Sequence, residues 1–273
     1  MPNVSADRPD PRSAGFGAPL PVGSITSMGH LEGKTALVTG ASAGIGAATA
    51  HRWASEGARV VLCARRKERL DALCAELGNA EAVVCDVRDA AAMRKAFDGR
   101  EFDLVLANAG LGRGMDKIGA GDEGEWAEMI DTNVKGVLHT IRATLPAMLK
   151  RGSGDFVVLG SVAGRQVYPG GNVYCATKHS VRAIYEALRL DHVGSGIRFT
   201  TVDPGMCETE FSIQRFRGDE EAAKRVYDGM TPLRPEDVAD AITYAVTRPP
   251  HVNVGEIVLW ASAQASTWLL KRN

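Results

Sequence analysis

Short β-rich runs alternate with longer helical stretches along almost the whole chain, beginning at Lys34. This order is typical of repeated βαβ units, in which neighbouring strands run parallel and a helix makes each crossover. The expected strands are Thr35–Thr39, Arg59–Ala64, Ala80–Cys85, Leu104–Ala107, Phe156–Gly160, Arg198–Val202 and Glu256–Trp260. The expected helices are Gly46–Glu56, Lys67–Leu77, Ala90–Phe97, Glu125–Ala147, Tyr174–Asp191 and Pro235–Thr247. The sequence therefore predicts an α/β fold built on a parallel sheet.

Length and composition favour a single folded domain. The 273 residues are 45% hydrophobic, which is ample for one large core. Residues 1–30 are rich in Pro, Gly and Ser and show neither helical nor strand periodicity, so we expect a flexible N-terminal extension or, alternatively, an arm at a subunit interface. Charges and prolines interrupt this stretch, so it does not resemble a secretory signal. The folded domain is expected to occupy residues 31–273.

Charge and cysteine usage restrict the partners of the chain. The formal net charge is −1, with 32 basic and 33 acidic residues, so there is no strong field for nucleic acid or an anionic membrane. No apolar run is long enough to span a bilayer. The five cysteines form no Cys-x-x-Cys pair, which favours a reduced, cytoplasmic protein, and no histidine has a metal-ligand spacing. We expect a small-molecule substrate, no membrane, no nucleic acid and no metal.

A glycine-rich turn joins the first expected strand to the first expected helix. Glycines permit a tight turn and a close approach of the backbone to a ligand, and the helix N-terminus offers free N–H groups to phosphate. The strand–turn–helix context makes this pattern a diphosphate cradle of the dinucleotide-binding kind. Its expected residues are Thr39, Gly40, Ala41, Ser42, Ala43, Gly44, Ile45 and Gly46.

The end of the second strand indicates which dinucleotide is bound. An acidic residue there bonds a free ribose 2′-hydroxyl, whereas arginine accommodates a 2′-phosphate. This chain has Arg65 and Arg66, so NADP(H) is expected, with Ser42 adding a hydroxyl. In the alternative interpretation, the two arginines are solvated residues that open a helix. Asp86, after the third strand, either accepts from the adenine amino group or caps the next helix.

Tyr174 and Lys178 are four residues apart on an expected helix and therefore share one face. A cation near a phenol favours the phenolate, so we expect Lys178 to lower the pKa of Tyr174 and make it a proton-transfer group. Ser161 follows a buried strand, at the edge of the sheet where ligands bind in such folds. Its hydroxyl is expected to hold the oxygen that Tyr174 protonates.

The segment from about 206 to 231 carries aromatic residues among many charges and follows a strand that ends at Asp203-Pro204-Gly205. We interpret it as a substrate lid. An amphipathic surface helix pair without ligand contact is the alternative.

Together, Gly40-x3-Gly44-x-Gly46, Asn108-Ala-Gly110, Asn133, Ser161, Tyr174-x3-Lys178 and Pro204-Gly205 resemble the short-chain dehydrogenase/reductase family. The resemblance covers residues 31 to about 260 and implies a single-domain, doubly wound Rossmann-type fold with a seven-stranded parallel sheet and helices on both faces. It also implies a catalytic tetrad in which Asn133 holds a water, Ser161 positions substrate, Tyr174 is the acid/base and Lys178 orients the nicotinamide ribose.

The same resemblance implies further cofactor contacts and an assembly. The remaining expected cofactor contacts are Asp86, Val87, Asn108, Ala109, Gly110, Tyr174, Lys178, Pro204, Gly205 and Thr209. The chain has Ala107 where the family usually has a second asparagine, but Asn108 keeps the other amide. The family also implies that the two longest expected helices, Glu125–Ala147 and Tyr174–Asp191, pair across subunits to form a homotetramer.

A narrower resemblance comes from Gly170-Gly-Asn-Val-Tyr174, the lid sequence Glu208–Asp219 and His251-Val-Asn-Val254. These segments are similar to the NADP-dependent 3-hydroxy acid dehydrogenase branch, which implies substrates such as serine, allo-threonine or 3-hydroxypropionate, or malonic semialdehyde in reverse. Arginine is suited to bidentate binding of the substrate carboxylate. The candidates are Arg165, Arg215 and Arg217, of which Arg215 is our choice. A reductase of bulkier ketones or 3-oxoacyl thioesters and, more remotely, a non-catalytic dinucleotide sensor are the alternatives.

Overall fold

The computed structural model describes residues 29–273. The first 28 residues of the predicted N-terminal extension lie outside this range. The first described residues contact the C-terminal end of the first helix, where the backbone N–H groups of His30 and Leu31 donate to Glu56.

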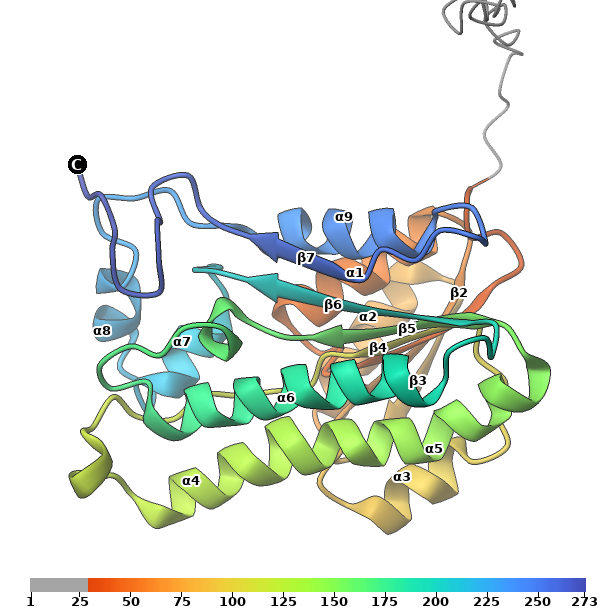
Figure 1. Cartoon of the computed structure of the whole chain (residues 1–273), viewed down its shortest axis with the longest axis horizontal. Helices are drawn as coiled ribbons and strands as arrows, with labels where there is room; N and C mark the ends of the chain where they lie inside the picture. The colour runs from red at the N-terminus through yellow and green to blue at the C-terminus, as the bar shows by residue number, and fades with distance from the viewer. Residues whose placement is uncertain (1–28) are drawn as a thin grey trace, which may run out of the picture.

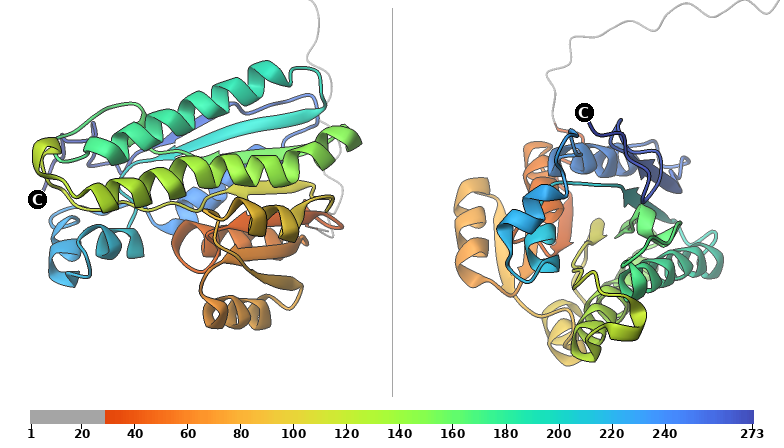
Figure 2. Two further views of the ribbon diagram at one scale, coloured as in Figure 1. Left: turned by 90° about the horizontal axis from the view of Figure 1, so that it is seen from below. Right: turned by 90° about the vertical axis from the view of Figure 1, so that its left-hand side faces the viewer.

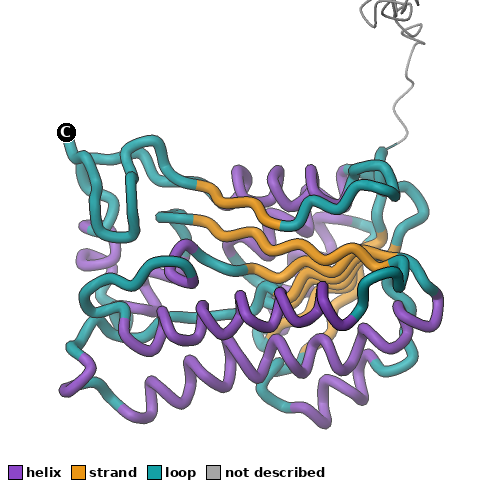
Figure 3. Tube along the Cα trace, viewed as in Figure 1, coloured by secondary structure: helices purple, strands orange, loops and turns teal. Residues whose placement is uncertain are grey.

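A seven-stranded parallel sheet forms the middle layer (Figures 1 and 3). The strand order is β3-β2-β1-β4-β5-β6-β7, which reverses direction between β1 and β4 and is the order of a doubly wound Rossmann-type sheet. The strands are β1 Thr35–Thr39, β2 Arg59–Ala64, β3 Ala80–Val84, β4 Leu104–Ala107, β5 Gly154–Leu159, β6 Ile197–Pro204 and β7 Glu256–Leu259. All seven predicted strands and the fold class are therefore confirmed.

Strand ends differ from the prediction where neighbouring strands extend the pairing. β6 is longer than expected because it pairs with β5 from Ile197 and with β7 as far as Pro204. β5 begins two residues early, at Gly154, opposite the start of β6. An apolar run read by itself does not reveal where its partner strands begin and end.

Helices cover both faces of the sheet (Figure 2). α1, α2 and α9 pack on one face over a core that includes Val38, Trp53 and Val202, and α3, α5 and α6 pack on the other over Phe97, Phe156 and Tyr185. The helices are α1 Gly44–Ser55, α2 Lys67–Leu77, α3 Ala90–Phe97, α4 Glu123–Ile130, α5 Gly136–Arg151, α6 Asn172–Asp191, α7 Glu210–Arg215, α8 Glu220–Arg225 and α9 Pro235–Val246. Short 3-10 turns lie at η1 Ile118–Ala120 and η3 Val162–Gly164.

The helix predicted over Glu125–Ala147 is not one uniform α-helix. A π-helical segment, η2 Asp131–Lys135, separates α4 from α5, and the N–H of Gly136 reaches back five residues to Asp131. Hydrophobic periodicity does not distinguish this insertion from a continuous helix, so the sequence prediction is wrong here. π-segments frequently mark functional positions, and this one contains Asn133.

The strands all point toward the end of the molecule where α7, α8 and the C-terminus lie (Figure 1). α7 and α8 come from the predicted lid segment, between β6 and α9. A cavity of about 500 Å³ lies at this end, against the carboxyl ends of the strands and under α7. The fold thus forms a pocket where ligands bind in open α/β sheets. Among residues 29–273, no helix combines the length and apolarity needed to cross a membrane.

Candidate active site

The cavity collects most of the residues that the sequence singled out. Its lining includes these predicted residues: Gly40, Ser42, Ala43, Gly44, Ile45, Arg65, Arg66, Asp86, Val87, Asn108, Ala109, Gly110, Ser161, Tyr174, Lys178, Pro204, Gly205, Thr209 and Arg215. Four of the expected cofactor-binding and catalytic residues lie outside the lining, namely Thr39, Ala41, Gly46 and Asn133, as do the candidate arginines Arg165 and Arg217. One continuous pocket therefore joins the glycine turn, the tyrosine–lysine pair and the lid.

The glycine turn is built for a close backbone approach. Gly40 has a φ of 67°, and a Cβ there would lie 2.8 Å from the Cα of Ala109. The side chain of Asn108 fixes the turn by donating to the carbonyls of Thr39 and Gly40 at 2.8 and 3.3 Å. Thr39 in turn accepts from the backbone N–H groups of Asn108 and Ala109. Thr39 therefore acts behind the turn rather than at the cavity wall.

The first helix presents its N-terminus to the cavity. Ala43, at the N-cap, provides no side-chain hydrogen bond to the first turn of α1. The helix dipole and these free N–H groups favour a phosphate at this position. The turn and the helix start therefore fit a dinucleotide diphosphate.

Arg66 lies at the end of the cavity beside the glycine turn. Its Nε and Nη2 donate to the Ser42 hydroxyl at 3.1 and 2.9 Å, and its Nη1 donates to the Glu210 carboxylate at 2.9 Å. Arg66 is also the N-cap of α2, so it both opens a helix and faces the pocket. Arg65 is exposed and lines the same end. Two guanidinium groups therefore lie where a 2′-phosphate is expected.

Asp86 lines the cavity but does not cap the next helix. Both of its carboxylate oxygens accept from Arg88, while Asp89 caps α3 by accepting from the N–H groups of Ala91 and Ala92 at 2.9 Å. Burial raises the pKa of Asp86, but the hydrogen bonds and charge of Arg88 outweigh it, so the pKa is lowered overall. The capping alternative is therefore excluded.

Ser161, Tyr174 and Lys178 meet at the ends of β5 and α6. Ser161 lies two residues after the end of β5, and its Oγ accepts from the N–H of Ala163 at 3.1 Å. Tyr174 lies in the first turn of α6, with Lys178 one turn later. The ammonium of Lys178 donates to the carbonyl of Leu159, the last residue of β5, at 2.9 Å. Strand and helix together hold all three side chains at the cavity wall.

The expected lowering of the Tyr174 pKa is wrong for this arrangement. Burial raises the pKa of the phenol and the neighbouring Tyr168 raises it further, while Ser161 and the charge of Arg215 offset this only in part. Burial also lowers the pKa of Lys178 to about 8, against the charge of Asp203, which raises it. Desolvation outweighs the attraction that spacing alone suggests. Tyr174 therefore remains a neutral phenol, which can donate a proton.

Asn133 lies behind the cavity wall. Its amide oxygen accepts from the N–H of Leu111 at 2.8 Å, and its amide nitrogen donates to the Leu111 carbonyl and to the Thr177 hydroxyl at 2.8 and 3.0 Å. The side chain is buried and bonded at both ends. It therefore joins the π-segment to α6 and to the loop after β4, and its role in holding a water remains a prediction.

The three candidate arginines have different environments. Arg165 pairs with the carboxylates of Asp203 and Glu256, and Arg217 pairs with those of Asp116 and Glu125. Neither has its charge free for a ligand.

Arg215 is buried in the cavity and has no carboxylate partner among the described residues. Its Nη1 donates to the Tyr168 hydroxyl at 2.6 Å, and its guanidinium carbon lies 5.2 Å from the centre of the Tyr174 ring. Its Nε is buried with no hydrogen-bond partner in the described chain. Among residues 29–273, this buried guanidinium lacks a carboxylate to balance its charge, and pairing with an anion would offset the cost of its burial.

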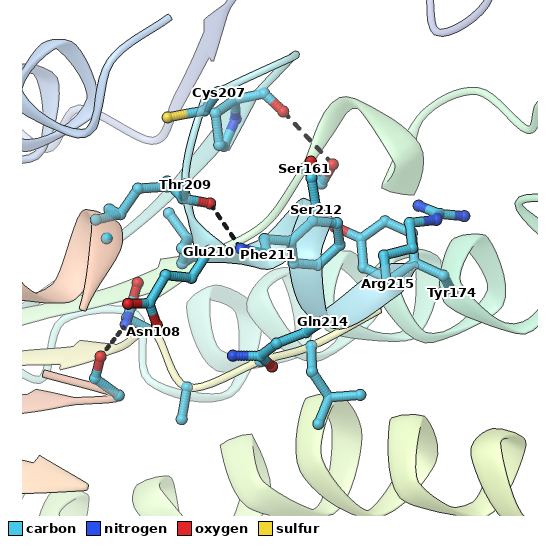
Figure 4. A pocket seen from close by; sticks show the side chains of 18 of the residues that line it. Asn108, Ser161, Tyr174, Cys207, Thr209, Glu210, Phe211, Ser212, Gln214 and Arg215 are labelled. Atoms are coloured by element: carbon cyan, nitrogen blue, oxygen red, sulfur yellow. Dashed lines mark hydrogen bonds between the residues drawn. The ribbon is translucent and has the colours of Figure 1, made fainter. Parts of the chain in front are cut away.

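The lid contributes residues that the sequence did not single out as contacts. Phe211 covers the tyrosine, with its ring centre 5.3 Å from that of Tyr174 (Figure 4). Glu210 accepts a hydrogen bond from Arg66 at 2.9 Å. Tyr168 and Gln264 also line the pocket, the latter from beyond β7. Phe211 and Glu210 could have been found from their position within the predicted lid, whereas nothing in the local sequence pointed to Gln264.

The fold, the glycine turn and the tyrosine–lysine pair together define a class of protein. The family model described as short chain dehydrogenase matches residues 34–220. Because this match covers more than half of the chain, the chain belongs to the short-chain dehydrogenase family. It is an oxidoreductase that interconverts alcohols and carbonyl compounds.

Among its relatives, the chain is similar to enzymes of small hydroxy acids and aldehydes. It is 41% identical to an NADP-dependent 3-hydroxy acid dehydrogenase of Salmonella typhi, over 84% of this chain and 95% of the relative. It is 42% identical to sulfoacetaldehyde reductase 2 of Chromohalobacter salexigens, over 84% and 94% of the two chains. A solved structure of serine dehydrogenase, in its closed form with NADP+, superposes with a TM-score of 0.84 at 38% identity, covering 88% of this chain and 99% of that one. The branch expected from the sequence is confirmed as the set of proteins this chain resembles.

Proposed function

We propose that this protein is an NADP(H)-dependent dehydrogenase of small 3-hydroxy acids, such as serine, allo-threonine or 3-hydroxypropionate, and reduces malonic semialdehyde in reverse. The observation that carries the proposal is the buried guanidinium of Arg215, which lies beside Tyr174 without a carboxylate partner among residues 29–273. A buried cation of this kind is stabilised when an anionic ligand pairs with it.

The spacing within the substrate supports the same assignment. A 3-hydroxy acid has one carbon between its carbinol carbon and its carboxyl carbon, so the reacting oxygen and the anionic group are close together. The guanidinium carbon of Arg215 lies 5.2 Å from the Tyr174 ring centre, which suits a short molecule that touches both side chains. Phe211, packed on Tyr174, limits the room above it. These features favour a small acid over a bulky ketone or thioester.

The residues present fit a nicotinamide dinucleotide with a 2′-phosphate. The turn at Gly40 leaves no room for a side chain, and the uncapped start of α1 offers N–H groups for the diphosphate. Arg66 already binds a carboxylate through Nη1, so this position is able to hold an anion. Arg65 adds a second positive charge at the same end of the cavity. This set supports NADP(H) as the cofactor.

The proposed chemistry places one proton and one hydride at the same carbon–oxygen bond. The nicotinamide supplies the hydride in reduction and accepts it in oxidation. In reduction, Tyr174 gives the phenol proton to the carbonyl oxygen while the Ser161 hydroxyl hydrogen-bonds that oxygen, which leaves Tyr174 as the phenolate. In oxidation, Tyr174 first loses its phenol proton to solvent, and the phenolate then takes the alcohol proton. Lys178, beside Gly110, is assigned to the nicotinamide ribose, and Asn133 is assigned to a water. Burial of Tyr174 supports its role as a proton donor.

A substrate panel followed at the NADPH absorbance tests the proposal. We expect turnover with serine and 3-hydroxypropionate and little with an acetoacetyl thioester. Isethionate belongs in the panel because it has a sulfonate at the same distance from its hydroxyl carbon, and a relative of this chain reduces sulfoacetaldehyde. A strong preference for the thioester would refute the hydroxy acid assignment, and a strong preference for isethionate would move it to sulfonates.

Replacing Arg215 by leucine tests the carboxylate contact directly. We expect the KM for the hydroxy acid to rise about 10- to 100-fold, as for loss of one charge-assisted, bidentate contact, with NADPH affinity nearly unchanged. Arg217→Leu is the matched control, since Arg217 lies in the same lid but pairs with Glu125 and Asp116. An unchanged KM in a folded Arg215→Leu protein would remove this residue from the site.

Two wider features belong to the same proposal. The exposed apolar side chains of Ile130, Leu138 and Leu190 lie along α4, α5 and α6, which supports pairing of the long helices in a homotetramer. All five cysteines are free, which supports a reducing, cytoplasmic location. Within the described residues, no group of three His, Cys, Asp or Glu side chains is placed to hold a metal ion.

A further inference from the structure

The lid begins with an acidic residue that reaches the cofactor end of the cavity. Glu210 is the first residue of α7, and its carboxylate accepts from Arg66 at 2.9 Å and also from Arg69. Thr209, just before it, caps α7 and lies against the glycine turn, since a Cβ on Gly44 would be 3.3 Å from the Thr209 side chain. The start of α7 is therefore fastened to both the turn and α2.

Arg66 has all three guanidinium nitrogens engaged in this arrangement. Nε and Nη2 donate to Ser42, and Nη1 donates to Glu210. Ser42 and Arg66 are the two residues expected to bind a 2′-phosphate. Here the carboxylate of Glu210, from the lid, pairs with Arg66 as that anion would. Burial raises the pKa of Glu210, but the hydrogen bonds from Arg66 and Arg69 outweigh it and the pKa is lowered, so the carboxylate is ionised at neutral pH.

A phosphate and a carboxylate on one guanidinium compete for its N–H groups and repel each other. Side chains at this end are partly exposed, 39% for Arg66 and 37% for Glu210, so rearrangement does not require opening a core. Glu210 also pairs with Arg69, which lies outside the cavity lining. Glu210 therefore keeps one cationic partner if Arg66 binds a ligand instead.

We propose that Glu210 is a specificity-determining residue for the cofactor: its carboxylate holds Arg66 in place of a 2′-phosphate, and a 2′-phosphorylated nucleotide must displace it. The inference rests on the proposed use of NADP(H). Displacement of Glu210 makes the lid sensitive to the 2′-phosphate, because Glu210 is the first residue of α7. The same helix places Phe211 and Arg215 over the part of the cavity where Tyr174 lies. Discrimination between the two dinucleotides is thereby set by Glu210 as well as by the arginines.

Binding of nucleotide fragments separates this effect from catalysis. Titration calorimetry with 2′,5′-ADP, which carries the 2′-phosphate, is compared with ADP, which lacks it. For Glu210→Gln we expect affinity for 2′,5′-ADP to increase about two- to fivefold, as for release of one partly exposed ion pair, with affinity for ADP unchanged. Glu208→Gln is the matched control: it removes the same charge from the same lid, but Glu208 has no ion pair in the described chain. That variant should bind both fragments as the parent does.

Hydrogen exchange of residues 207–216 without ligand supplies the structural readout. We expect faster exchange in Glu210→Gln than in the parent, and added 2′,5′-ADP should raise exchange at Glu210 in the parent toward that of the variant. If Glu210→Gln binds 2′,5′-ADP more weakly, or changes both fragments equally, the displacement model is overturned. If the parent itself binds the two fragments equally, the proposed preference for NADP(H) fails, and the inference fails with it.

Discussion

Lys178 gives the sharpest quantitative prediction, because its ammonium is buried at the cavity wall. Burial lowers its pKa to about 8 from an ordinary value of 10.5. Between these two pH values, the unfolded chain holds a proton on this lysine that the folded chain has lost. The unfolded state therefore binds more protons, and the free energy of unfolding rises with pH through this window.

The magnitude follows from the difference between the two pKa values. The difference is 2.5 pKa units, and at about 1.4 kcal/mol for each, the charged lysine costs about 3 kcal/mol of stability at low pH, of which about 2.5 kcal/mol is recovered between pH 7 and pH 10. Lys178→Met has a similar length and no charge, so this pH dependence is absent from the variant. The bond from Lys178 to the Leu159 carbonyl is lost as well, but both the ammonium and the neutral amine can donate it, so that loss lowers stability by about the same amount across the pH range.

Urea unfolding of the parent and of Lys178→Met at several pH values between 7 and 10 measures the effect. Relative to the variant, the parent should gain about 2.5 kcal/mol as the pH rises across this range. Lys224→Met is the control, since Lys224 is exposed and, among residues 29–273, pairs only with Glu221; its difference from the parent should not change with pH across this range. A flat difference for Lys178→Met, or one of opposite sign, would show that burial does not depress this pKa.

Two further predictions concern the reaction and the assembly. Tyr174→Phe should abolish turnover while NADPH binding, followed by fluorescence titration, stays near that of the parent, because the change removes the proton and little of the pocket; a near-normal kcat would contradict the assigned acid/base role. Sedimentation equilibrium should give four times the mass of the 29.0 kDa chain, because exposed apolar side chains lie along the long helices; a monomer at micromolar concentration would contradict the tetramer.

Much of this structure could be predicted from local sequence patterns. Alternating strand and helix periodicity gave all seven strands, since each is an apolar run bounded by turn residues. Glycine spacing located the turn at Gly40, because few other residues adopt its backbone angles at so close a contact. These features depend on neighbours in the chain, which a sequence shows directly.

Other features depended on contacts between distant segments. Asn133, within the π-segment, bonds the distant Leu111 and Thr177, and Gln264 reaches the pocket from beyond the last strand. The four-residue spacing of Tyr174 and Lys178 predicted a lowered pKa for Tyr174, but burial raises that pKa. Burial depends on all the groups packed around a side chain, which the spacing of two residues does not show.

The sequence by itself thus determined the fold class, the glycine turn and the positions of the tyrosine and lysine, all of which follow from periodicity and short-range spacing. Only the tertiary structure decided which of the three arginines is left without a carboxylate and that Glu210 lies on Arg66, 144 positions away in the chain. Charge is visible in a sequence, but whether a charge is paired, buried or free depends on what folding places against it.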